Sequence, residues 1–160
     1  MVGASVQSQR LDGTTQGASL HMAPAFLDAL YAELKWKKVD FAGEYWRSPM
    51  YPVLTVGSDV MPIPMDQRAW YVMATYELAK KLQVGTYYSH YVNKSADTSL
   101  PENYSIDWVI AGRYNFNQYF YGKVEGHFLH GTGLGYYAST NPDGLKSNSN
   151  MLAARVGFTF

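Results

Sequence analysis

The chain is notable first for what it lacks. It contains no cysteine, which excludes a disulfide framework, a thiolate metal site and a thiol nucleophile. Charged residues make up only 16% of the sequence and the formal net charge is zero, so nothing indicates a nucleic-acid partner. No apolar run is long enough for a membrane-spanning helix, and residues 1–13 show neither the basic nor the apolar region of a signal peptide. We expect no metal and no cofactor.

What the sequence does contain is a repeated alternation of apolar and polar residues. In the stretch 106–115, for example, the apolar residues Ile106, Trp108 and Ile110 lie on one side of the alternation. The charged residues of this stretch, Asp107 and Arg113, both lie on the other side. Similar runs occupy 30–36, 39–47, 70–78, 82–90, 119–128 and 152–160, with a weaker one at 1–11. A period of two over this length predicts β-strands.

The connections between these runs are of two kinds. Those around 37–38, 79–81 and 115–118 are short, whereas 12–27, 48–67, 92–104 and 131–149 are long and rich in Gly, Pro, Ser, Asn and Asp. Short turns at one end and long loops at the other are typical of an antiparallel, up-and-down outer-membrane β-barrel. We therefore predict an all-β transmembrane barrel with about eight strands in this chain. Each strand is long enough to cross the bilayer at a tilt.

One segment is ambiguous. Residues 23–38 include good helix formers, and Phe26, Leu27, Leu30 and Leu34 would share one helical face. The two-lysine turn that follows, and the alternating run after it, favour a strand from Leu30 to Trp36. The sequence leaves 23–29 open between helix and strand.

The distribution of charge favours a membrane barrel over a soluble one. The apolar members of each run are large and uncharged, whereas the opposite face carries ions of both signs, which would be costly to bury inside a small soluble barrel. We predict that this face lines the lumen, through Glu33, Lys35, Glu44, Glu77, Arg113, Lys123, Glu125 and Arg155. We predict an interfacial aromatic girdle at Trp36, Tyr45, Trp70, Tyr88, Tyr119, Phe158 and Phe160. A soluble barrel that carries an apolar ligand is the alternative.

The C-terminal stretch NMLAARVGFTF alternates up to the last residue, Phe160. It resembles the terminal signature that the barrel-assembly machinery of bacterial outer membranes reads. The resemblance implies the outer membrane of a Gram-negative bacterium as the location. It also implies two partners, the lipid bilayer and that machinery.

Two stretches carry a further resemblance. AWYVMATYELAKKLQVGTYYS and DWVIAGRYNFNQYFYGKVEGHFLHGTGL are similar to the C-terminal half of porins of the phosphate-selective type, over 68–160 with weaker support at 29–47. This implies a water-filled channel, usually a homotrimer, that passes small solutes or ions. It also implies that 1–160 is a single partial-barrel domain of a 16–18-stranded barrel. The lumen set mixes cations with at least as many carboxylates, so the sequence does not predict anion selectivity.

Other interpretations stay open. The same charged residues could form an internal salt-bridge network in a closed eight-stranded barrel, with a structural or adhesive role for its long loops. Loop 48–67 is apolar enough to fold into the lumen or to contact another subunit of a trimer. Asp107, Glu125 and His127 could face one another across a hairpin, whereas His127 and His130 should point to opposite faces. No serine has a convincing nucleophile context, and we do not expect an enzyme.

Overall fold

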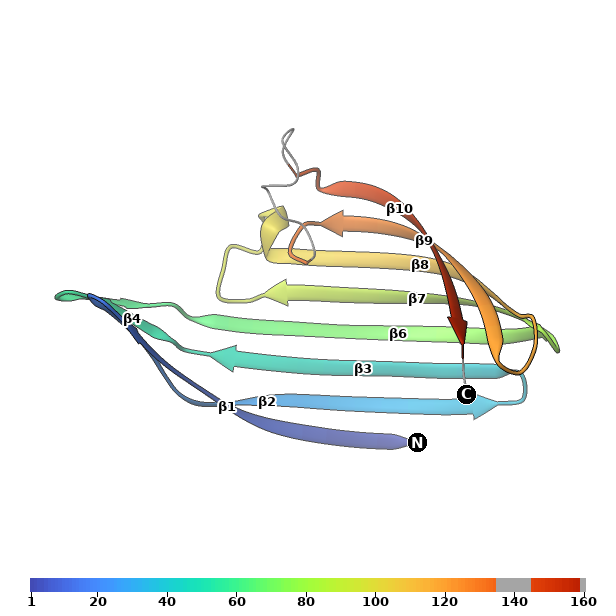
Figure 1. Ribbon diagram of the computed structural model, residues 1–160, viewed down its shortest axis with the longest axis horizontal. Coiled ribbons are helices and arrows are strands. Elements are labelled where there is room, and N and C mark those ends of the chain that lie inside the picture. The colour runs from blue at the N-terminus through green and yellow to red at the C-terminus, as the bar shows by residue number, and fades with distance from the viewer. Residues whose placement is uncertain (135–144, 159–160) are drawn as a thin grey trace.

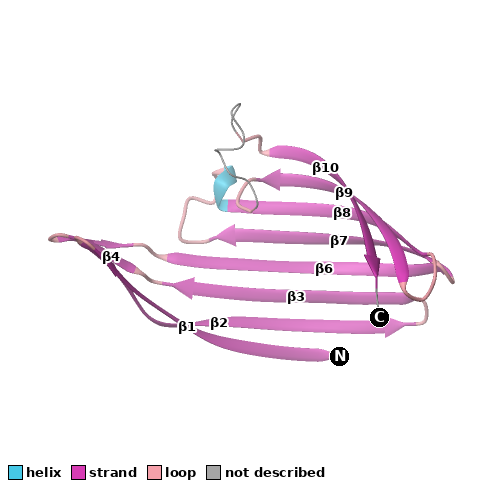
Figure 2. Ribbon diagram, in the orientation of Figure 1, coloured by secondary structure: helices cyan, strands magenta, loops and turns pink. Residues whose placement is uncertain are grey.

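The computed structural model describes residues 1–134 and 145–158 and consists almost entirely of one antiparallel sheet (Figure 1). The strands are β1 (Val2–Thr15), β2 (Ala18–Trp36), β3 (Val39–Met50), β4 (Val53–Val56), β5 (Asp59–Pro62), β6 (Met65–Ala79), β7 (Leu82–Asn93), β8 (Tyr104–Asn115), β9 (Phe120–Gly131) and β10 (Asn148–Phe158). The single helical element described is a 3-10 turn, η1 (Pro101–Asn103), which Figure 2 shows beside the ends of the strands.

The eight long strands follow each other up and down through the sheet. Its order is β10-β9-β8-β7-β6-β3-β2, with β1 paired to β2 on the far side. The turns at 37–38, 80–81 and 116–119 lie together at one end, and Lys37 takes the positive φ of 56° that such a tight turn requires. The predicted all-β, antiparallel, up-and-down architecture is confirmed. The undecided segment 23–29 is part of β2.

The prediction of a long loop at 12–27 is wrong. β1 and β2 continue through most of it as a hairpin that turns at Gln16 and Gly17, with Gly17 at φ 82°. The predicted loop 48–67 contains a second hairpin, β4–β5, whose first strand pairs with the start of β2 from Ala18 to His21. Together these pieces extend beyond the ends of β3 and β6, at the left of Figure 1, so loop 48–67 does not fold inward.

The two faces of the sheet differ in chemistry. On the outer face, register brings Leu34, Phe41, Ala74, Thr86, Ile110, Gly126 and Leu152 into one cross-strand row. The rows on either side are equally free of charge, and large apolar side chains on this face are widely exposed, Leu34 at 62%. Charged side chains lie on the opposite face. An uncharged face of this size, left uncovered, is typical of a surface that meets lipid.

The outer face becomes charged only at the long-loop end. Arg47 and Arg68 are direct cross-strand partners, and both guanidiniums bond to the carboxylate of Asp66. The Arg47 Nε–Asp66 Oδ1 distance is 2.9 Å and the Arg68 Nη2–Asp66 Oδ2 distance is 2.6 Å. Because like charges directly opposite each other destabilise a strand pair, the half-buried Asp66 holds this pairing together.

We expect Asp66→Asn to lower the free energy of unfolding by about 1 kcal/mol, because it removes the carboxylate charge that bonds to both of the facing arginines. Urea titration of the reconstituted protein measures this loss. Asp59→Asn, in the exposed β4–β5 hairpin, removes the same charge and serves as the control. Equal effects of the two variants would contradict the assigned role of Asp66.

The sheet is curved but not closed. In Figure 1 the lower half of β10 swings across the other strands toward β2, and the start of β1 and the end of β10 lie on the tight-turn side. Among the described residues, β1 and β10 each pair on one side alone, so each presents an unpaired edge. No described helix is long and apolar enough to cross a membrane.

Candidate functional site: a charged trough

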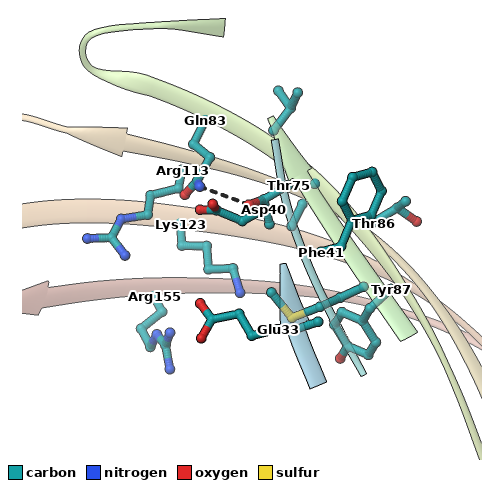
Figure 3. A pocket seen from close by; sticks show the side chains of 15 residues that line it. Glu33, Asp40, Phe41, Thr75, Gln83, Thr86, Tyr87, Arg113, Lys123 and Arg155 are labelled. Carbon is teal, nitrogen blue, oxygen red and sulfur yellow. Dashed lines mark hydrogen bonds between the residues drawn. The ribbon is translucent and has the colours of Figure 1, made fainter. Parts of the chain in front are cut away.

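The polar face of the sheet encloses an open cavity of about 290 Å³, here called the trough. Its lining comes from β2, β3, β6, β7, β8, β9 and β10, and Figure 3 shows the charged side chains of Glu33, Lys123 and Arg155 close to one another in it. The residues that border it are Glu33, Asp40, Phe41, Ala42, Met73, Thr75, Gln83, Val84, Gly85, Thr86, Tyr87, Ala111, Arg113, Lys123 and Arg155. Of these, Phe41, Val84 and Thr86 belong to the outer-face rows. Strands far apart in the sequence therefore share one polar space because the sheet curls.

One side of the trough is basic. Arg113 pairs across the strands with Lys123, and Lys123 pairs with Arg155, so three cations stand in one row over β8, β9 and β10. Arg113 is held by the Asn115 side chain at 2.9 Å and by the ring of Tyr121, 3.9 Å from the guanidinium carbon. Three facing cations are unfavourable next to each other unless water or an anion screens them.

The other side of the trough is acidic. Glu33 on β2 and Asp40 on β3 line the same cavity, and in the view of Figure 3 the Glu33 carboxylate points from β2 toward Lys123 and Arg155. The strands between the two walls contribute neutral groups. Among these, the Gln83 amide donates to the Thr75 hydroxyl at 3.0 Å.

The walls are not joined by ion pairs among the described residues. Lys35 and Glu33 approach to 3.9 Å and Lys123 and Glu125 to 2.7 Å, but each pair belongs to a single strand. A closed salt-bridge network would instead link strands across the interior. The charges of the two walls are therefore left facing an open space, where they can act on a solute.

A second polar group lies deeper along the trough face. His127 Nδ1 is 2.8 Å from Asp107 Oδ2, and the ring of Tyr87 meets the imidazole edge-on. The sequence analysis placed both Asp107 and Glu125 near His127. Asp107 contacts the imidazole, whereas the Glu125 carboxylate bonds to Lys123. As expected, His130 points to the other face, where it contacts Tyr104 and Asn148. Within 1–134 and 145–158, no three His, Asp or Glu residues form a metal-binding group.

The structure places the predicted lumen residues in several surroundings on the polar face. Glu33, Arg113, Lys123 and Arg155 line the trough. Lys35 and Glu77 line a neighbouring recess beside the lysines of the tight turns, and Glu44 lines a small recess with Trp46 and Tyr71 nearer the long loops. Glu125 bonds to Lys123. Sequence reasoning missed Asp40, Gln83, Thr75 and Tyr87 as trough residues, although the same alternation places all four on this face.

The predicted girdle residues that belong to described strands lie on the outer face of the sheet. Tyr45 and Trp70 are cross-strand partners, and the rings of Trp70 and Tyr88 are 5.5 Å apart. Trp108 and Phe128, not predicted, continue the same line at 5.9 Å. At the tight-turn end stand Trp36, Tyr119 and Phe158. Phe160 lies outside the described residues.

Comparison with known proteins identifies the class of fold. No protein-family model matches the sequence, and no curated protein matches it. Among solved structures, the anion-selective porin from Comamonas acidovorans superposes with a TM-score of 0.61 at 11% sequence identity. The match covers 98% of this chain and 43% of that porin. The fold is thus porin-like, and this chain spans less than half the length of the porin. The resemblance to the phosphate-selective type in particular finds no support in these comparisons.

Proposed function

We propose that this chain forms part of a porin-like channel in the outer membrane of a Gram-negative bacterium, through which small hydrophilic solutes or ions diffuse passively. The observation that carries the proposal is the two-faced sheet. One face is uncharged and exposed, and the other holds an open trough whose walls carry opposite charge and, among the described residues, are not joined by ion pairs. A lipid-facing outside and a wet inside account for both.

The uncharged band has the height that such a role needs. On β8 it runs from Ile106 to Tyr114, roughly nine residues, the length with which a tilted strand crosses the hydrocarbon layer. Aromatic rows border the band at both levels, as at a membrane interface. No step of the proposed activity requires catalysis, since pore width and lumen charge select among solutes.

The open edges of β1 and β10 support a barrel larger than this sheet. A membrane barrel must pair every edge, because an unpaired backbone group in hydrocarbon costs several kcal/mol. We infer that additional strands complete the wall, which agrees with the match of this chain to only 43% of the solved porin. A homotrimer and recognition of the C-terminal strand by the assembly machinery belong to the same proposal.

Planar-bilayer recording of the intact protein tests the channel. We expect stepwise increases of current in KCl that grow linearly with voltage, because the trough is open and its walls are hydrated. A protein that inserts, as judged by protection of its strands from protease, and yet gives no current steps would contradict the channel. It would favour the closed structural barrel.

A further inference from the structure

The two walls of the trough carry charges that a single solute can satisfy together. Arg113, Lys123 and Arg155 form the basic wall, and Glu33 and Asp40 the acidic wall of the same cavity (Figure 3). A simple anion is attracted to one wall and repelled by the other, and the same holds for a simple cation. A solute with a carboxylate and an ammonium group meets a partner on each side.

From this arrangement we propose that the trough is a binding and transit site for small zwitterionic solutes of the amino-acid class. The carboxylate of the solute faces the Arg113–Lys123–Arg155 row, and its ammonium group faces Glu33 and Asp40. This inference rests on the proposed channel and names the class of solute that its trough favours.

The geometry of the basic wall fits this role. Arg113 is fixed by Asn115 and by the Tyr121 ring, and the Tyr121 ring in turn covers Gly157, where any Cβ would overlap it. A guanidinium held in place loses little freedom when it binds a carboxylate. Lys123 already bonds to Glu125, whereas Arg155 forms no ion pair within residues 1–134 and 145–158, so Arg155 is the cation most available to a solute.

The acidic wall contains one cation, Lys35, which lies 3.9 Å from the Glu33 carboxylate, too far for a hydrogen bond. Lys35 is also the cross-strand partner of Asp40, but within the described residues Asp40 forms no ion pair, so both carboxylates can accept a second cation. Thr75, Gln83 and Tyr87 line the floor between the walls with neutral polar groups. The middle of the solute therefore crosses a polar but uncharged strip.

The test compares two isomers of identical composition and similar size, zwitterionic β-alanine and uncharged lactamide, in swelling assays with vesicles that contain the intact protein. We expect the ratio of β-alanine entry to lactamide entry to fall about fivefold in Glu33→Gln/Asp40→Asn and in Arg155→Gln, from the loss of a hydrated ion-pair contact on either wall. Asp59→Asn, outside the trough, should leave the ratio unchanged.

A second readout separates lost recognition from a damaged protein. Removing Glu33 and Asp40 charges should shift the reversal potential across a KCl gradient toward chloride, and removing Arg155 should shift it toward potassium. Entry of lactamide with a ratio that none of the variants alters would overturn the zwitterion site and leave the channel standing. Failure of both solutes to enter vesicles that hold inserted protein would overturn the channel itself.

Discussion

Replacing Ile110 by arginine is expected to destabilise the protein by about 2–4 kcal/mol, the cost of an arginine on the lipid face of a barrel near the bilayer midplane. Ile110 lies in the middle of β8, is 52% exposed on the outer face, and has Thr86 and Gly126 as its cross-strand neighbours. None of them can partner a guanidinium charge in hydrocarbon. Urea unfolding in lipid vesicles, followed by tryptophan fluorescence, measures the change.

The adjacent residue provides the matched control. Ala111 lines the trough, so Ala111→Arg puts the same side chain into hydrated space. We expect a cost below 1 kcal/mol for Ala111→Arg, together with a lower single-channel conductance, because the new side chain occupies part of the trough. In a soluble barrel with an apolar interior the order would reverse, and Ile110→Arg would be the harmless variant. That result would contradict the membrane barrel and favour the soluble barrel.

The second large effect is expected at Gly131, where β9 ends at φ 89°. A Cβ at this position would overlap the Tyr104 carbonyl oxygen, which is backbone and cannot move aside. The Gly131 amide also donates to the Ser147 carbonyl at 2.7 Å, which ties β9 to the start of β10. Gly131→Ala combines left-handed strain with this overlap, and we expect it to lower stability by about 2–4 kcal/mol.

Gly126 is the control for this prediction. It lies on the same strand, and a Cβ added there would meet no atom within 4 Å. We expect Gly126→Ala to change the free energy of unfolding by no more than about 0.5 kcal/mol in the same urea titration. Similar values for the two alanine variants would show that the chain does not turn at Gly131 as described.

The fold was readable because its main signal is local. Alternation and short turns are visible within a few neighbouring residues. For this reason β3, β6, β7, β8 and β9 could be predicted from the sequence alone. The β1–β2 extension could not, since its turn at Gln16–Gly17 interrupts no clear alternation. Its partner strand β4 lies more than thirty positions further along the chain, a pairing that no local pattern reveals.

The site was readable in part for the same reason. Alternation places Arg113, Lys123 and Arg155 on the polar face, and the sequence counted them only as members of a mixed set. Their alignment in one row depends on the registers in which β8 pairs with β9 and β9 with β10, and alternation within a single strand does not give these registers. Counting charges without register therefore hides a segregation that the sheet creates.

The open edges of β1 and β10 make the sheet prone to pairing with other strands. Each edge offers a row of backbone donors and acceptors that water can satisfy and hydrocarbon cannot. In water the sheet is therefore a template on which strands of another chain can add. If the proposed channel is right, closure of the wall and insertion into the bilayer must occur together, because an unpaired edge is stable only in water.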